Sequence, residues 1–305
     1  MTQIELDKII EKNRVYTKEG RVATYIPGLA SANPNNLGVV IVSEDGTIMK
    51  SGDCDVRFAI ESISKTIVLA LALLDNGPEG VFRKIGQEPT GDAFNSIKRL
   101  ETGPLHRPSN PYINAGAIAT ASLIKGNDPV EKFNRVLDFM KKISEDDSLY
   151  LDSDIYLSEK ETGDTNRALA YYMKSYGDIE GNVDAILDVY FKQCSISVTA
   201  ETLAKIGMFF ARDGVLSTGE RVMPEGYAKI ITGLMITCGH YNESGEYLVE
   251  VGVATKSGVG GGLLATVPGK YGIGTFSPPL DPKGNSTAGI KVMKDVVEIL
   301  GVSIL

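Results

Sequence analysis

The spacing of apolar and polar positions divides the chain into sheet-forming ends and a helical middle. Residues 3–13 place apolar side chains at helical spacing, and residues 286–300 do the same at the other end. Residues 37–43 and 47–50 are apolar runs on either side of a Glu-Asp-Gly turn, which predicts a β-hairpin. Further strands are expected late in the chain, at residues 247–251, 262–267 and 271–276.

The middle of the chain is mostly helical in pattern. The predicted helices are residues 62–75, 114–125, 129–143, 166–176, 182–193 and 199–212. Sheet segments from both ends around such a middle predict an α/β (α+β) fold. We expect residues 1–61 and 213–305 to form a lobe with an antiparallel sheet flanked by terminal helices. Residues 62–212 would form a mainly helical lobe, with the active cleft where the lobes meet.

The strongest chemical signal is Ser62, which stands three residues before Lys65 at the start of an apolar run that ends at Leu74. Residues at this spacing lie on one face of a helix. Burial lowers the pKa of a lysine, and a neutral lysine can take the proton of a serine hydroxyl. The alternative is a lysine that lies at the start of a core helix and extends its amine to water.

The same spacing recurs at Ser122 and Lys125, in a different context. Lys125 is followed by a Gly-Asn-Asp-Pro segment, so it lies in the last turn of a helix. A cation there complements the helix dipole and faces water. We therefore interpret Lys125 as a surface residue.

A second signal is the segment Lys256–Gly262, in which a Lys-Ser-Gly sequence precedes Val259 and three glycines. Glycines let a substrate approach the backbone and leave N–H groups exposed as donors to an oxyanion. The alternative is an ordinary turn or bulge. A phosphate-binding loop is disfavoured because the lysine precedes the glycines.

Composition narrows the class of protein. The net charge is −8 without a basic run, which disfavours nucleic acid and anionic membranes as partners. The longest apolar run, residues 66–74, is too short to span a bilayer, and the charged N-terminal residues are unlike a signal peptide. Cys54, Cys194 and Cys238 lack metal-like spacing. We expect reduced thiols in a cytoplasmic protein, with no metal.

The Ser62-x-x-Lys65 and Lys256-Ser257-Gly258 motifs resemble those of the serine β-lactamase and penicillin-binding superfamily. The chain is more specifically similar to the serine-dependent glutaminase family. This resemblance follows the chain in order and covers nearly all of it. Its segments are residues 23–27, 110–117, 158–159, 190–191, 238–241, 256–262, 277–281 and 284–286, together with Asn166. It implies a β-lactamase/DD-peptidase-like fold.

The resemblance also implies a reaction, the hydrolysis of L-glutamine to L-glutamate and ammonia through an acyl-enzyme, without cofactor or metal. Ser62 would be the nucleophile, Lys65 its base and Tyr241 the proton donor to ammonia, while backbone N–H groups of Ser62 and Val259 would form the oxyanion hole. The family suggests a homotetramer. The implied substrate-binding residues are Tyr25, Ser62, Asn114, Glu159, Asn166, Tyr190, Tyr241 and Val259.

Taken without the family, several of these residues have ordinary structural interpretations. Asn114 precedes a run of small residues and would be a helix N-cap. Glu159 would be a solvated residue in a charged loop. Tyr190 and Tyr241 would be packing residues with a hydrogen-bonded hydroxyl.

Two positions depart from the family pattern. Glu61 stands where the family has glutamine, and a carboxylate there would raise the pKa of Lys65. His240 replaces an apolar residue and is interpreted as a neighbour of the pocket. Neither departure removes a catalytic group.

Two other functions remain open at this stage. A penicillin-recognising serine hydrolase would share both motifs, but an export signal and a clear Ser-x-Asn element are missing. A non-catalytic amino-acid-binding protein on the same fold predicts loss of Ser62, Lys65 or Tyr241, and all three are present.

Overall fold

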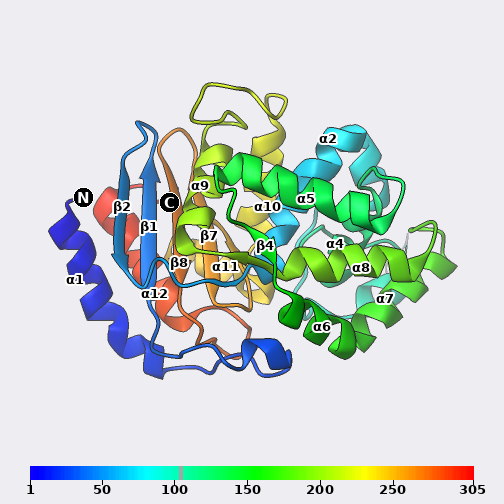
Figure 1. Cartoon of the computed structure of the whole chain (residues 1–305), viewed down its shortest axis with the longest axis horizontal. Coiled ribbons are helices and arrows are strands. Elements are labelled where there is room, and N and C mark those ends of the chain that lie inside the picture. The colour runs from blue at the N-terminus through cyan, green and yellow to red at the C-terminus, as the bar shows by residue number, and fades with distance from the viewer. Residues whose placement is uncertain (103–105) are drawn as a thin grey trace.

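The computed structural model describes residues 1–102 and 106–305, and its larger sheet is antiparallel with five strands (Figure 1). β1 pairs with β8, which places Gly38 opposite Phe276, so the two ends of the chain build one sheet. The spatial order is β2 (Ile48–Gly52), β1 (Gly38–Ser43), β8 (Tyr271–Phe276), β7 (Gly262–Val267) and β6 (Ala254–Ser257). The predicted hairpin and the two glycine-flanked strands are confirmed.

Helices cover both faces of this sheet. α9 (Ala200–Ala211) packs against β8, β7 and β1 on one face. α1 (Gln3–Asn13) and α12 (Thr287–Leu300) lie together on the other (Figure 1). A Cβ on Gly272 of β8 would collide with the backbone of α9, so glycine permits this close approach.

The terminal helices begin at side-chain caps. Thr2 and Glu5 form a capping box at the start of α1, and Ser286 caps α12. Each helix buries one apolar stripe, with Leu6 of α1 and Val296 of α12 fully buried in a shared cluster. The helices predicted at the two ends of the chain are therefore confirmed.

A group of helices around α2 and α4 forms the other part of the molecule (Figure 1). α2 is kinked at Gly77, which has a φ of 67° and is followed by Pro78. Helices of this group include α2 (Ser64–Lys84), α4 (Asn114–Ser122), α5 (Pro129–Ser144), α7 (Asp164–Ser175) and α8 (Val183–Cys194). The remaining helices are α3 (Lys98–Thr102), α6 (Ser153–Thr162), α10 (Tyr227–Cys238) and α11 (Ser244–Glu250). Short 3-10 turns are η1 (Arg14–Lys18), η2 (Pro27–Leu29), η3 (Glu61–Ile63) and η4 (Tyr241–Glu243).

A small second sheet connects these parts. Its order is β3 (Phe58–Ala59), β5 (Ile196–Val198) and β4 (Tyr150–Leu151). β3 leads directly into η3 and then α2, which places Ser62 at the junction of the large sheet and the helices.

The structure corrects part of the prediction. Residues 247–251 were expected to form a strand, but Tyr247 lies in helix α11. Tyr247 and Val251 are buried four residues apart while Val249 is 79% exposed, which is helical spacing that the β-branched composition obscured. Helices α6 and α10 were not predicted.

The division into lobes at residues 61 and 213 stays a prediction, although α9 from the predicted helical part covers the sheet. Among residues 1–102 and 106–305, every helix is too short or too polar to cross a bilayer.

Candidate active site

Ser62 lies in a tight connection between strand β3 and helix α2. Its side chain is mostly buried, with 8% of the residue exposed. The preceding residue, Glu61, has a φ of 50°, which non-glycine residues seldom adopt. Ser64 stabilises the turn, because its hydroxyl donates to the Glu61 carbonyl at 2.7 Å. The serine is thus held at the start of a buried helix.

Lys65 is in the first turn of α2 and is 1% exposed. Its Nζ donates to the carbonyl oxygen of Tyr112 at 3.0 Å and to Oδ1 of Asn114 at 2.8 Å. Burial lowers the pKa of Lys65 to about 8, although the nearby Cys194, Glu159 and Glu61 act in the opposite direction. The expected effect of Glu61 on Lys65 is therefore present but smaller than the effect of burial.

Asn114 connects the lysine to a second helix. The residue that caps α4 is Ile113, so the N-cap interpretation of Asn114 is wrong. Its amide nitrogen instead donates to Oδ1 of Asn166 on α7 at 2.9 Å. Because its oxygen accepts from Lys65, the Asn114 amide is fixed in orientation by both neighbours.

Glu159 is on helix α6, not in a loop, and only 7% of it is exposed. The expectation of a solvated surface residue is wrong because Asp152 caps an unpredicted helix here. The Glu159 carboxyl contacts that of Glu61, and burial raises the pKa of both groups. The cavity therefore contains two desolvated carboxyl groups near Lys65.

The glycine-rich segment forms the opposite wall. Lys256 on β6 is fully buried, and its Nζ donates to the carbonyl oxygens of Gly239 at 3.1 Å and Ser257 at 2.6 Å. Burial, with Lys65 nearby, holds the pKa of Lys256 well below its usual range. The turn after β6 is closed by the Gly261 N–H, which donates to the Gly258 carbonyl at 2.9 Å.

Two backbone donors remain available at Ser62 and Val259. Within residues 1–102 and 106–305, the N–H groups of Ser62 and Val259 donate to no other protein group. Both residues line the same cavity. Buried backbone N–H groups are otherwise almost always paired, so this arrangement suits an oxyanion.

Tyr241 begins η4 with a φ of 52° and is 8% exposed. Its ring lies 4.8 Å from that of Phe94 and 4.7 Å from Nζ of Lys256. Its hydroxyl donates to the carbonyl oxygen of Ser257 at 3.5 Å. Burial raises the pKa of the phenol, while the nearby Ser62 side chain acts in the opposite direction. The phenol is therefore protonated at neutral pH. His240 lies apart, stacked on Tyr247 at 3.5 Å, and burial lowers its pKa well below the usual range.

Seven of the nine predicted site residues line one cavity of about 100 Å³. Of the other two, Lys65 donates to Asn114 in the cavity wall, and Tyr241 lies in an apolar cluster with Val259. Tyr25, 56% exposed, is the most accessible of these side chains. The seven are Tyr25, Ser62, Asn114, Glu159, Asn166, Tyr190 and Val259.

Several other residues of the wall were not predicted from the sequence. Cys194 lies one turn beyond Tyr190 on α8, and Thr162 lies one turn beyond Glu159 on α6. Helical spacing from the predicted residues would have found both. Phe94 and Asn95 come from an irregular segment that no periodic pattern marks.

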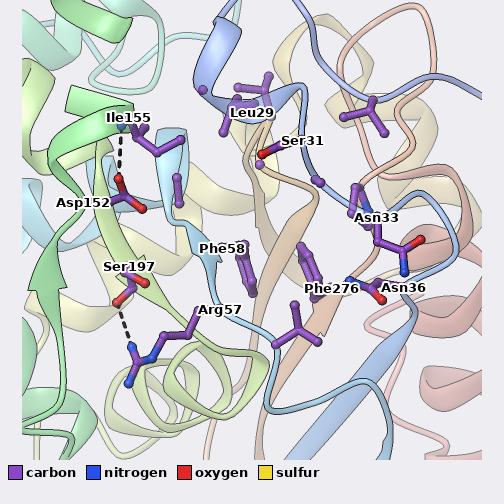
Figure 2. A pocket seen from close by; sticks show the side chains of 18 of the residues that line it. Leu29, Ser31, Asn33, Asn36, Arg57, Phe58, Asp152, Ile155, Ser197 and Phe276 are labelled. Atoms are coloured by element: carbon purple, nitrogen blue, oxygen red, sulfur yellow. Dashed lines mark hydrogen bonds between the residues drawn. The ribbon is translucent and has the colours of Figure 1, made fainter. Parts of the chain in front are cut away.

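A larger pocket of about 380 Å³, shown in Figure 2, shares Val259 with this cavity. Its floor is the stacked pair Phe58 and Phe276, with ring centroids 4.1 Å apart. Arg57 donates to the carbonyl of Ser197 at 3.4 Å at one end. This pocket lacks the Ser62 and Lys65 pair, so its size does not make it the reactive site. In the described part of the chain, no group of three or more His, Cys, Asp or Glu residues could hold a metal ion.

Comparison with known proteins agrees with this geometry. The Glutaminase family profile matches residues 20–305. Glutaminase 2 of Clostridium perfringens (strain 13 / Type A) is 54% identical over 300 residues, which is 98% of each chain. A crystal structure of a Bacillus subtilis probable glutaminase is 38% identical with a TM-score of 0.93, covering 99% of this chain and 97% of that one.

A further solved structure is the covalent complex between the Bacillus subtilis glutaminase YbgJ and 5-oxo-L-norleucine, formed by reaction with 6-diazo-5-oxo-L-norleucine. It is 36% identical with a TM-score of 0.90, and 99% of each chain is covered. The expected β-lactamase-like fold is confirmed by these structural neighbours.

Proposed function

The chain belongs to the glutaminase family and is an enzyme that hydrolyses L-glutamine to L-glutamate and ammonia; we propose that the reaction runs through an acyl-enzyme on Ser62. The observation that carries this mechanism is the pairing of Ser62 with a buried Lys65 whose pKa is lowered to about 8. A lysine with this pKa is partly neutral at physiological pH and can act as a base.

In the first step Lys65 accepts the proton of Ser62, and Oγ of Ser62 attacks the side-chain carbonyl carbon of glutamine. The C–O bond forms while the carbonyl π electrons move onto oxygen. The N–H groups of Ser62 and Val259 then donate to this oxyanion, and one such donor contributes about 3 kcal/mol of transition-state stabilisation.

In the second step the C–N bond breaks and Tyr241 donates its proton to the leaving ammonia. The phenol is suited to this role because its raised pKa keeps it protonated until the leaving group needs a proton. The proton held by Lys65 then restores the phenol. Water attacks the resulting ester with Lys65 again as base, which releases L-glutamate and regenerates Ser62.

The charged end of the substrate has matching groups in the cavity. The carboxyl of Glu159, which lines the cavity, would pair with the ammonium group. Amide and phenol donors of Asn166, Tyr190 and Tyr25 would bind the carboxylate, and the hydrogen bonds of Asn114 to Lys65 and Asn166 would orient both. The covalent complex of the Bacillus subtilis relative supports a covalent route on this fold.

Ammonia release from L-glutamine by Ser62→Ala protein tests the mechanism. We expect the rate to fall by a factor on the order of 10⁴ or more. Ser122→Ala is the matched control, since Ser122 ends α4 with its hydroxyl bonded to the Ala119 carbonyl at 2.7 Å, and it should retain activity. Full activity in Ser62→Ala would exclude the acyl-enzyme. Turnover of a chromogenic β-lactam instead of glutamine would favour the penicillin-recognising alternative.

We also propose that the enzyme is a cytoplasmic homotetramer. The three cysteines are free and buried, which suits a reducing compartment. Light scattering coupled to gel filtration should give four times the chain mass of 32.8 kDa. A monomeric mass would contradict the assembly, and secretion of the native protein would contradict the compartment.

A further inference from the structure

Glu61 holds a carboxyl group in the wall of the active cavity, directly before the nucleophile. The residue is 2% exposed, and within the described residues its Oε1 has no hydrogen-bond partner. Its left-handed backbone, with φ of 50°, is maintained by the Ser64 bond described above. A buried carboxyl oxygen without a partner is costly unless a proton or ligand satisfies it. Backbone strain at such a position is typical of a functional site.

The groups around Glu61 include a second carboxyl group and one cation. Glu159 on α6 touches it, and Lys65 on α2 is the cation that acts on it. The neighbouring Cys194 and Tyr190 on α8 are neutral, because burial raises the pKa of each well above its usual range.

The remaining neighbours do not change this balance. Tyr241 on η4 is protonated, and Tyr25 contributes a phenol near the entrance. Burial, and then the nearby Lys65, lower the pKa of Lys256 on β6, which disfavours its charged form. β7 carries no titratable side chain. Two carboxyl groups in contact therefore share the field of one buried lysine.

Two buried carboxylates in contact repel each other, and one of them then retains a proton. The pKa of Glu61 is raised well above its usual range by burial and by Glu159, which is the direction this contact requires. A primary ammonium group placed between the two oxygens would remove the need for that proton, because it supplies one positive charge and three donors.

We propose that Glu61 and Glu159 hold one proton between them in the free enzyme, and that the α-ammonium group of the substrate displaces this proton on binding. The inference rests on the proposed function, since it requires an amino acid in this cavity. The exchange is balanced: the pair changes from one negative charge to two, the ammonium group stays protonated, and one proton passes to solvent. Glu61 is then a specificity-determining residue for an ammonium-bearing substrate.

Isothermal titration of Ser62→Ala protein with L-glutamine tests this without turnover. Titrations at pH 7 in buffers of different ionisation enthalpy give the number of protons released. We expect release to approach one proton per L-glutamine, and to fall to near zero in the Ser62→Ala, Glu61→Gln double variant. Glutaramate, which lacks the ammonium group, should release none from either protein.

The pH dependence of affinity is a second readout that needs no further variant. The proton competes with the ligand below the pKa of the pair, so the Kd for L-glutamine should fall by up to about tenfold per pH unit as the pH rises toward that pKa. Glutaramate should not show this slope. Glu159→Gln should also remove it, which covers the case in which Glu61→Gln does not fold.

The outcomes separate the two claims. Binding of L-glutamine without proton release, or equal release from the Glu61→Gln protein, overturns the proton exchange and leaves the glutaminase mechanism intact. Absence of L-glutamine binding, together with a wild-type enzyme that releases no ammonia, overturns the proposed function and with it this inference.

Discussion

Two cavities share Val259, and they differ both in volume and in the burial of the charged groups around them. The cavity at Ser62 is about 100 Å³, whereas the pocket of Figure 2 is about 380 Å³. Yet Glu61, which lines the smaller one, and Lys65, whose amine donates to Asn114 in its wall, are almost fully buried. In the larger pocket Arg57 is hydrogen-bonded to Ser197 and to the hydroxyl of Ser148 at 2.7 Å. The charged groups that are removed from water are therefore at the smaller cavity.

This contrast follows from electrostatics. A charge in a low-dielectric site interacts strongly with its neighbours and shifts their pKa, whereas solvent screens a charge on an open wall. The small cavity is therefore suited to proton transfer. The large pocket offers shape and an aromatic floor, with no base near a nucleophile. Each of the following predictions tests one side of this difference.

The largest effect is expected at Lys65. Lys65→Met keeps the length of the side chain within the core but removes the base, so kcat/KM should fall by about 10³- to 10⁴-fold. In the wild type, activity should rise with pH through about 8, because the lysine becomes neutral there. Steady-state ammonia release across pH measures both.

Lys125→Met provides the matched control for this change. Its backbone N–H donates to Asp75 at 2.8 Å near the surface, far from the chemistry, so activity should be retained. Equal losses of activity in Lys65→Met and Lys125→Met would contradict the role of Lys65 as the base.

Gly260 tests the wall that separates the two cavities. A Cβ at Gly260 would collide with the carbonyl oxygen of Ala59, so Gly260→Ala must shift the turn that carries Val259. We expect kcat to fall by about 10- to 100-fold with little change in KM, because the oxyanion donor is displaced more than the binding groups. A change in KM alone would argue against the donor role of Val259.

Asn114→Asp adjusts the base instead of removing it. A carboxylate at this position, 2.8 Å from Nζ in the present amide, would favour the charged lysine and raise the pKa of Lys65. Activity at pH 7 should fall by about tenfold, and part of the loss should return at higher pH. A pH profile identical to that of the wild type would show that Asn114 does not face the catalytic amine.

The smallest effect is expected in the larger pocket. Arg57→Ala removes hydrogen bonds to Ser148 and Ser197 and should leave kcat and KM for L-glutamine within about twofold. The free energy of unfolding should fall by about 1 kcal/mol or less, which a lower melting temperature would report. A tenfold loss of activity would show that the two cavities act together.

Residues with periodic neighbours were predictable from the sequence, and residues placed by caps and turns were not. The apolar spacing of α1 and α12 and the run after Lys65 gave their elements directly. Glu159 was misplaced because its helix α6 is short and polar, and begins at an aspartate cap. No local pattern reveals that Glu61 touches Glu159, since that contact depends on how α6 packs over the turn before Ser62.

The pairing of β1 with β8 also constrains how the protein is made. Gly38 leaves the ribosome long before its partner Phe276 is synthesised. Strand β1 must therefore wait, with the edge that faces β8 unpaired, until residues 271–276 have been made. Contacts of such long sequence separation slow folding, while the helical part can form during synthesis. A nascent chain thus acquires the turn at Val259 long after Ser62 has been synthesised, so we expect no ammonia release before that turn has formed.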